Sequence, residues 1–481
     1  MKQHPVIIIG AGPAGLTAAY ELVKRGIQPI VLEKSAQVGG IARTEVYKGY
    51  RFDIGGHRFY TKVEAVQKLW LEVMGDEFIK VPRLSRIYYR DRFFNYPLEL
   101  TDTLLKLGLL ESFRILLSYL KIKILPHKQE ETLEEWVTNR FGRRLFLTFF
   151  KTYTEKVWGI PCDKIQADWA AQRIKGLSLT TAVINALFKT NNTKTLIKEF
   201  DYPLLGPGMM WERFQSAVEQ QGGEVCLNMG VVRLKREGNR ICSVTVRQAG
   251  ATIDLCGDQF ISSMPVAALV QRLDPPPPDA VLQAARSLNY RAFMIVSLII
   301  DRPHLFPDNW IYIHSPEVNV GRIQNFKNWS PAMVPDPTKT CLGMEYFCNE
   351  GDALWKMSDT ELLDLATREI AKLGLASAHE VEDGVVLRQP KAYPVYDRDY
   401  RQHLKVIQKF LGTIENLQTT GRNGMHRYNN QDHSMLTGML AVRNLFGEHH
   451  DLWDVNTERS YYEEFTKEKV KQSNSSELLV G

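Results

Sequence analysis

Residues 4–44 read HPVIIIGAGPAGLTAAYELVKRGIQPIVLEKSAQVGGIART, and this stretch decides the fold. The unbroken apolar run from Val6 to Ile9 predicts a strand buried on both faces, as in a parallel sheet. Apolar residues then recur at helical spacing until Gly26, and a second strand ends in Glu33. Between the first strand and the helix, the spacing G-x-G-x-x-G is formed by Gly10, Gly12 and Gly15. The stretch therefore predicts a strand–helix–strand unit with a glycine-rich first turn.

This turn has the properties of a dinucleotide site. The first glycine permits a tight turn, the second lets the backbone approach a pyrophosphate, and the third lets the helix pack on the strand. The first N–H groups of the helix have no intrahelical partner, so a phosphate fits there. Glu33 lies 23 residues after Gly10, where a carboxylate binds a free ribose diol, which favours FAD or NAD over NADP. The residues expected at the dinucleotide are Gly10, Gly12, Pro13, Ala14, Gly15, Glu33 and Lys34.

Two more glycine segments follow, GGIART at 39–44 and FDIGGHRFY at 52–60. A basic glycine turn directly after the second strand can reach a second phosphate or a flavin ring. The combination resembles the FAD-binding amine oxidase superfamily, which includes protoporphyrinogen-oxidase-like proteins. Its first βαβ unit continues into G-G-x-x-x-[ST] and then into a D-x-G-x-x-x-F segment near the isoalloxazine. This resemblance places at the FAD cofactor Gly40, Ile41, Ala42, Arg43, Gly56 and His57.

Two later segments resemble further parts of the same superfamily. The turn GPGM at 206–209 leads to a helix and then to a strand at 231–234, where the backbone of Val231 would meet the adenine. The stretch DQFISSMP at 258–265 matches the strand that returns towards the cofactor. Near the C-terminus, GRNG at 421–424 precedes a helical pattern whose first amides would face the flavin or its phosphates. The residues expected there are Arg422, Asp432, His433, Ser434 and Met435.

Within the superfamily, the chain most resembles UDP-galactopyranose mutase-like flavoproteins. The motifs that carry this resemblance are TYTEKVWG (152–159), GGHRFYTK (55–62), VGRIQNFKNW (320–329), AYPVYD (392–397) and GRNGMHRYNNQD (421–432). The resemblance implies catalytic roles for His57, Arg322 and Tyr393. It implies substrate binding by Tyr153, Lys156, Trp158, Arg173 and Tyr428. Flat aromatic faces can stack a ring, and cations can neutralise a diphosphate.

Each of these assignments has a purely structural alternative: Trp158 as a core residue, Arg322 as a surface residue and His57 as an ordinary hydrogen-bonded histidine. The mutase pattern R-x-P-x-R is also incomplete here, because Leu177 stands in place of the second arginine. This departure favours an FAD-dependent oxidoreductase acting on a polar, nucleotide- or lipid-linked sugar. The alternatives are a mutase-like isomerase that uses reduced FAD N5 as nucleophile, and a non-catalytic flavin-binding partner subunit.

The expected fold is α/β: a Rossmann-like FAD-binding domain with a helical insert and a mixed β-sheet substrate domain. The chain has 481 residues, which is enough for two or three domains. The polyproline run at 274–279 is a natural boundary. The expected regions are a discontinuous FAD-binding domain (1–75, 200–273 and 389–465), a mainly helical domain (76–199), a β-rich substrate-binding domain (274–388) and a disordered tail (466–481).

Composition limits the classes of partner. A net charge of +5 is mild: it suits an anionic small-molecule substrate and does not indicate nucleic acid. Six cysteines without a C-x-x-C pair, and a strand close to the N-terminus, indicate a reduced cytoplasmic protein without a signal peptide. No metal-ligand spacing is present. The leucine-rich stretch 103–125 carries five charged side chains, which predicts one or two amphipathic helices. The alternative for this stretch is a basic helical face that contacts a membrane or a lipid-linked substrate.

Overall fold

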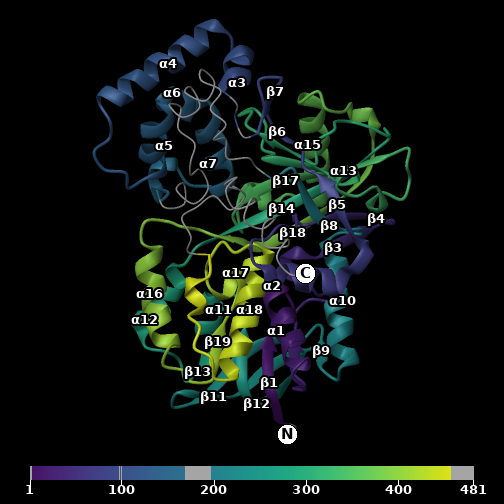
Figure 1. The fold of residues 1–481 in the computed structure, drawn as a ribbon, viewed down its shortest axis with the longest axis vertical. Coiled ribbons are helices and arrows are strands. Elements are labelled where there is room, and N and C mark those ends of the chain that lie inside the picture. The colour runs from purple at the N-terminus through teal and green to yellow at the C-terminus, as the bar shows by residue number, and fades with distance from the viewer. Residues whose placement is uncertain (1–2, 97, 99, 168–196, 457–481) are drawn as a thin grey trace, which may run out of the picture.

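A computed structural model describes residues 3–96, 98, 100–167 and 197–456 (Figure 1). Two large sheets dominate the fold, one in the lower half of Figure 1 and one in the upper half beside a group of helices. This arrangement confirms the predicted α/β class. Arg173, Leu177 and the expected tail 466–481 lie outside the described residues.

The lower sheet carries the unit predicted from residues 4–44. Its strands are, in spatial order, β13 (Leu273–Asp274), β10 (Gly230–Glu237), β11 (Arg240–Gln248), β12 (Ala251–Ser262), β1 (Gln3–Ile9), β2 (Ile30–Leu32) and β9 (Glu224–Cys226), with β19 (Leu417–Thr419) beside β12. Strand β1 is parallel to both β12 and β2. The helices packed around this sheet include α1 (Pro13–Val23), α10 (Pro207–Gln220), α11 (Val266–Val270), α12 (Asp279–Ser287), α16 (Tyr400–Leu411), α17 (Gly421–Gly424) and α18 (Gln431–Leu445).

Glycines set the close packing in this unit. A Cβ added at Gly15 would lie 1.9 Å from the carbonyl oxygen of Gly10, so only glycine lets α1 pack on the turn. A Cβ added at Gly438 of α18 would lie 2.4 Å from the carbonyl oxygen of Ala14. Helices α1 and α18 therefore lie in direct backbone contact. The predicted role of Gly15, which is to let α1 pack closely on β1 and its turn, is confirmed.

The upper sheet is mixed. Its strands are, in spatial order, β18 (Val381–Pro394), β14 (Tyr290–Ile300), β17 (Thr340–Cys348), β16 (Arg322–Asn325), β15 (Trp310–Ile313), β6 (Ser85–Tyr89) and β7 (Arg92–Asn95). Short helices α13 (Phe326–Trp329) and α14 (Ala353–Lys356) and the longer α15 (Asp359–Lys372) accompany it. Two small sheets and α2 (Glu64–Met74) connect the halves; the small sheets pair β3 (Thr44–Tyr47) with β4 (Tyr50–Asp53) and β5 (Phe78–Pro82) with β8 (Glu199–Pro203).

Residues 78–95 form strands β5, β6 and β7 within the region expected to be mainly helical. Strand β5 pairs with β8 and strand β6 pairs with β15, so partners far along the chain decide the strand structure of these residues. The helices of that region follow: α3 (Leu100–Leu107), α4 (Leu109–Ile124), α5 (Leu133–Phe141), α6 (Arg143–Leu145) and, after a π-helical stretch, α7 (Thr152–Trp158). The stretch 103–125 thus lies on two helices, as predicted. No helix among the described residues is long and apolar enough to cross a membrane.

Candidate functional site

The turn between β1 and α1 faces a second glycine turn. A Cβ added at Gly12 would meet only the Cα of Gly40, at 4.0 Å, and one added at Gly40 would meet only the Cα of Gly12, at 3.4 Å. Helix α1 has no side-chain cap, and its first intrahelical bond runs from Leu16 N–H to the Gly12 carbonyl at 3.0 Å. Two backbone segments therefore meet without side chains between them, at a helix N-terminus suited to a phosphate.

Glu33 is held rigidly at the end of β2. Its Oε2 accepts the N–H of Ala11 at 2.8 Å, and its Oε1 accepts the N–H of Ser35 at 2.9 Å. The Ser35 hydroxyl also donates to Oε1, so three of the about four hydrogen bonds that a carboxylate can accept are formed, and one acceptor position remains for a ribose diol. The start of β10 lies alongside, because Met229 N–H donates to the Glu33 carbonyl at 2.7 Å. Val231, the residue expected at the adenine, thus begins its strand beside Glu33.

The second glycine segment is fixed by a buried carboxylate, Asp53. Thr44 Oγ1 donates to Asp53 Oδ1 at 2.9 Å and itself accepts Gly208 N–H at 2.9 Å, while Tyr202 Oη donates to Asp53 Oδ2. These bonds join β3, β4 and the first turn of α10. Asp53 therefore positions the turns at 39–44 and 206–209 relative to each other.

Burial raises the pKa of Asp53 from its ordinary 3.8 to about 7, although the hydroxyls of Tyr202 and Thr44 act to lower it. Between pH 4 and pH 7 the native chain then holds a proton that the unfolded chain has released, so rising pH favours unfolding. We expect this residue to cost the wild type on the order of 4 kcal/mol of stability over that range. Asp53→Asn stays neutral at every pH and should abolish that loss. The check is the difference between the urea unfolding free energies of the two proteins at each pH. A difference that stays constant from pH 4 to pH 7 would contradict this role.

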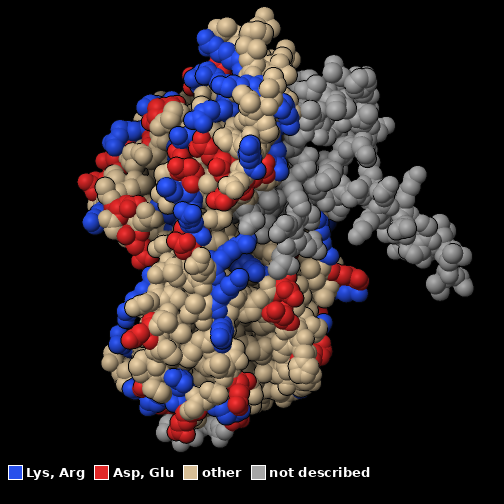
Figure 2. Space-filling view, turned by 90° about the vertical axis from the view of Figure 1, so that its left-hand side faces the viewer, with Lys and Arg blue, Asp and Glu red and all other residues tan. Residues whose placement is uncertain are grey.

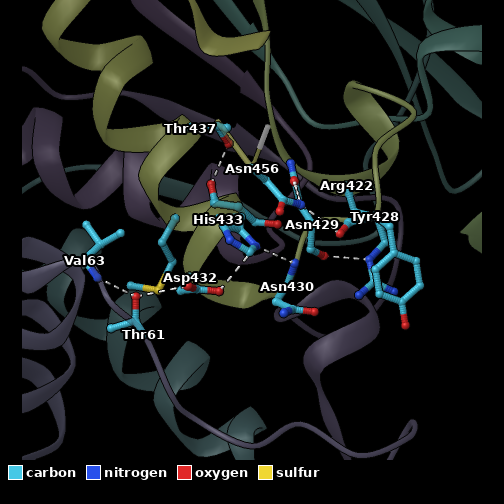
Figure 3. Close-up of polar contacts among 12 residues, drawn as sticks. Thr61, Val63, Arg422, Tyr428, Asn429, Asn430, Asp432, His433, Thr437 and Asn456 are labelled. Carbon is cyan, nitrogen blue, oxygen red and sulfur yellow. Dashed lines mark hydrogen bonds and ion pairs between the residues drawn. The ribbon is translucent and has the colours of Figure 1, made fainter. Parts of the chain in front are cut away.

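The first turn of α18 is the part of the site that comes from the C-terminal region of the chain (Figure 3). Asp432 Oδ2 accepts the hydroxyl of Thr61 at 3.0 Å, and the ring Nδ1 of His433 accepts the N–H of Asn430 at 3.3 Å. Met435 Sδ lies 2.9 Å from the indole nitrogen of Trp70. Asp432, His433 and Met435 are thus engaged within the protein. The contribution of this turn to a cofactor would be the positive end of the helix dipole at the N-terminus of α18.

Arg43 links the same region to the upper sheet. Its Nη1 donates to the Gly40 carbonyl at 2.9 Å and to Gln389 Oε1 at 3.1 Å, and its Nε donates to Glu45 Oε1 at 2.6 Å. Gln389 lies on β18. The guanidinium therefore holds the second glycine turn against the sheet that carries the expected substrate residues.

A row of polar side chains crosses the upper sheet at Arg322. The strand register places Tyr312 of β15 opposite Arg322 of β16, and Arg322 opposite Glu345 of β17. Arg322 Nε donates to Glu345 Oε2 at 2.6 Å, and Gln324 Nε2 donates to Glu345 Oε1 at 2.7 Å. Glu345 has no exposed side-chain surface, whereas Arg322 retains 19%. Burial opposes the charge of Arg322, but Glu345 raises its pKa well above the ordinary value, so the guanidinium stays charged and fixed.

His57 and the segment before it lie beside this row. A Cβ added at Gly55 would lie 3.6 Å from Arg322 Nη2 and 3.8 Å from Glu345 Oε1. His57 Nε2 lies 2.9 Å from the Ile54 carbonyl, which can only accept, so Nε2 carries the proton. Burial, followed by the nearby charge of Arg422, lowers the pKa of His57 to about 4. The imidazole is therefore neutral at pH 7.

Aromatic rings gather next to His57. Tyr393 and Tyr428 stack at 5.6 Å and 16°, and the guanidinium of Arg422 lies 4.7 Å from the Tyr428 ring centre. Trp158 contacts both rings, at 6.5 Å from Tyr393 and 6.3 Å from Tyr428. Arg422 Nε donates to the Asn429 carbonyl at 2.8 Å (Figure 3). The rings belong to α7, β18 and the loop before α18, so three distant segments form one aromatic group.

Helix α7 supplies a second cation. Lys156 Nζ donates to the carbonyls of Ser315 at 2.7 Å and Val320 at 3.2 Å, and burial lowers its pKa to about 8. Tyr153, one turn earlier, stacks on His314 at 4.8 Å and 6°. Within the described part of the chain, no carboxylate lies within ion-pair distance of Lys156 or Arg422. Both cations donate to backbone carbonyls, and the negative charges of Glu369 and Glu317 also act on Lys156.

The expected site residues thus form a cofactor group around the glycine turns and Glu33, and a substrate group around Arg322 and the aromatic rings. The two groups meet at His57, Arg43 and Arg422. Their functional roles stay predictions. Sequence reasoning missed the residues that orient Arg322 and Tyr153: Glu345, Gln324 and His314. Glu345 had a local signal, since it is the single acid in the apolar run CLGMEYFC. Among the described residues, no group of three His, Cys, Asp or Glu side chains is placed to hold a metal ion.

These features fit FAD. The side-chain-free contact between Gly12 and Gly40 suits a pyrophosphate, and the buried, oriented Glu33 carboxylate suits a ribose diol. Val231 would meet the adenine, and the segments at Gly56 and at the first turn of α18 would flank the flavin.

Comparison with known proteins agrees with this geometry. The model of a family described as flavin containing amine oxidoreductase matches residues 13–397. The inactive all-trans-retinol 13,14-reductase of Danio rerio is 48% identical over 50 residues, which are 10% of this chain and 8% of that protein. The putative flavin-containing monoamine oxidase AofH of Mycobacterium tuberculosis is 25% identical over 297 residues, 58% of this chain and 61% of that protein. The match thus spans less than two thirds of either relative.

Solved structures share the fold along most of the chain. Reduced UDP-galactopyranose mutase superposes with a TM-score of 0.82 at 20% identity, covering 95% of this chain and 99% of that one. A putative protoporphyrinogen oxidase from Exiguobacterium sp. 255-15 superposes with a TM-score of 0.70 at 17% identity, covering 92% and 99%. At such identities the likeness establishes the fold alone.

Proposed function

Because the chain belongs to the flavin containing amine oxidoreductase family, we propose that it is an FAD-dependent oxidoreductase acting on an anionic, nucleotide- or lipid-linked sugar. The observation that carries the substrate class is the Arg422 guanidinium, 4.7 Å from the centre of the stacked Tyr428 ring, with Lys156 as a second cation on the helix that also carries Trp158. Because Arg422 donates to the backbone carbonyls of Asn429 and Ala392, which carry no charge, its positive charge can attract a diphosphate.

The cofactor is FAD. The residues that would hold it are the Gly10–Gly15 turn, Glu33, the Gly40–Arg43 turn, Val231 and the first turn of α18. When bound, it supplies a two-electron acceptor for oxidation of the substrate, and dioxygen or another acceptor regenerates it.

The protein's own side chains bind and orient the substrate. Lys156 and Arg422 attract the diphosphate, and the rings of Trp158, Tyr393 and Tyr428 offer flat faces to a base or sugar. Arg322, immobilised by Glu345, presents a fixed guanidinium fork. His57 is neutral with its Nε2 proton directed to the Ile54 carbonyl, so it positions the segment at Gly55 rather than supplying positive charge.

A mutase-like isomerase is the second candidate. It is favoured by Tyr153, Lys156 and Trp158, which belong to the motif TYTEKVWG and lie on α7; Trp158 of this helix contacts the ring of Tyr393. In this case the same cations would stabilise a leaving diphosphate while reduced FAD takes part as nucleophile. Leu177 argues against it, since the second arginine of the mutase pattern is missing.

The two candidates are separated by anaerobic visible spectra of the purified holoenzyme, recorded with a panel of nucleotide sugars. Bleaching of the flavin band by one sugar supports the oxidoreductase. If no sugar bleaches the band, yet one is isomerised only after the flavin is reduced with dithionite, the isomerase replaces it. If no anionic sugar perturbs the flavin spectrum or is converted, the proposed substrate class is wrong.

We expect Lys156→Met to weaken binding of an anionic sugar about tenfold, because it removes a charge next to the diphosphate. The matched control is Lys327→Met. Lys327 also donates to backbone carbonyls only, at Pro303, Pro337 and Lys339, but lies away from the aromatic group. The measurement is titration of each holoenzyme by the change in flavin absorbance. Equal losses in both variants would assign Lys156 a purely structural role.

A further inference from the structure

The outward side of α4 exposes a continuous apolar stripe. Its exposed fractions run from 47% at Leu116 to 92% at Leu109. The residues of this stripe, hereafter the α4 outer face, are Leu109, Leu110, Phe113, Leu116, Leu117, Leu120 and Ile124. At 3.6 residues per turn they fall within roughly 120° of the helix circumference. Isolated exposed leucines are common, but a contiguous stripe of this kind marks an interaction site.

The opposite side of α4 fixes this orientation. Ile115 and Tyr119 are buried in a hydrophobic cluster with Trp136, Phe149 and Trp158. A Cβ added at Gly142 would lie 3.0 Å from the Cα of Tyr119, so α4 sits in close backbone contact with the turn before α6. The α4 outer face therefore points outward because the helix already has a packed side.

Basic side chains border the α4 outer face. Arg114 and Lys121 fall along one edge of the stripe and Lys123 along the other, by the same helical count. The one acid of α4, Glu111, lies towards the packed side, where Arg144 Nη2 donates to its Oε2 at 2.9 Å. Figure 2 shows Lys and Arg beside uncharged surface at the top of the molecule, where α4 lies.

We propose that the α4 outer face docks on a lipid bilayer that contains anionic lipids. An apolar helical stripe edged by Lys and Arg is complementary to such a surface: the leucines enter the acyl boundary and the cations meet the headgroups. Docking would hold the membrane against the helical unit whose core includes Trp158, and Tyr393 and Tyr428 pack on that core.

This inference goes beyond the proposed function and does not depend on it, because membrane binding can be measured without turnover. The test is flotation of the full-length holoenzyme with phosphatidylcholine vesicles, with and without phosphatidylserine, at low and at high salt. We expect binding to the phosphatidylserine vesicles and a loss of at least tenfold for Leu116→Gln/Leu117→Gln/Leu120→Gln. A second variant, Lys121→Gln/Lys123→Gln, removes two charges without touching the leucines. It should bind roughly tenfold more weakly or worse at low salt.

The matched control is Lys405→Gln/Lys409→Gln, which removes two exposed lysines from α16. It should bind as the wild type does. The inference is overturned if the wild type does not float, or if both α4 variants float as well as it does. It is also overturned if the wild type forms a dimer that the leucine variant dissociates, with no vesicle binding, since the α4 outer face would then contact a second copy.

Discussion

Replacing Arg322 with lysine is expected to lower kcat/KM for the anionic sugar on the order of 100-fold while the protein stays folded. Lysine keeps a positive charge opposite the buried Glu345, but it lacks the planar fork that Glu345, itself bonded to Gln324, holds in one orientation. A fixed donor aimed at developing charge contributes a factor of this size to catalysis. Steady-state kinetics and thermal unfolding of the same preparation measure the two effects separately.

Arg322→Ala should behave differently from Arg322→Lys. It leaves Glu345, which has no exposed side-chain surface, without its charged partner. Breaking a buried ion pair in this way costs about 3–5 kcal/mol of stability. The matched control is Arg302→Lys. Arg302 donates to Glu380 Oε1 through its Nε at 2.8 Å and its Nη2 at 2.6 Å, next to the same sheet but away from the aromatic group. Normal activity in Arg322→Lys, or an equal loss in Arg302→Lys, would rule out a functional role for Arg322.

The second large effect is expected at Gly12. Gly12→Ala should lower the affinity for FAD on the order of 100-fold with little change in the stability of the apoprotein. The backbone of Gly12, at φ −81° and ψ −175°, is open to any residue, and the added Cβ would have no protein atom closer than 4.0 Å. That Cβ would instead stand where the pyrophosphate approaches the backbone. Fluorescence titration of the apoprotein with FAD measures the affinity, and urea unfolding measures the stability.

Substitutions at two other glycines serve as comparisons for Gly12→Ala. Gly15→Ala would place a Cβ 1.9 Å from the Gly10 carbonyl oxygen, so it should destabilise the fold itself. Gly412→Ala, at φ −63° and ψ −12° after α16, is the control away from the site; its Cβ would lie 3.3 Å from the Gln408 carbonyl oxygen, so it should keep FAD with only a small change in stability. If Gly12→Ala binds FAD as tightly as the wild type, the cofactor does not lie between Gly12 and Gly40.

The cofactor half of the site could be predicted from the sequence because its determinants are local. The glycine spacing, the β-branched strand and Glu33 all lie within the first 44 residues, and their contacts follow from one supersecondary unit. The row of Tyr312, Arg322 and Glu345 could not be predicted in the same way. It depends on the register of three strands, and register is set by pairing between distant segments.

The helices at 100–124 show that helical periodicity does not predict which apolar face is buried. The sequence predicted amphipathic helices, but α4 carries apolar residues on two sides. Ile115 and Tyr119 face inward, and Leu116 and Leu120 face outward. Periodicity identifies a helix with apolar faces, whereas the packing of α5 and α6 decides which of them is covered. Residues 78–95 form strands inside a region expected to be mainly helical, because their partner strands β8 and β15 come from distant parts of the chain.

The most direct check of a flavoenzyme built around Gly12, Glu33 and Gly40 is the visible absorption spectrum of the purified wild-type chain, after incubation with FAD and gel filtration. We expect the flavin bands to co-elute with the protein at a stoichiometric ratio, and FAD to be released on denaturation. A colourless protein that retains no added FAD would contradict the assignment of this site.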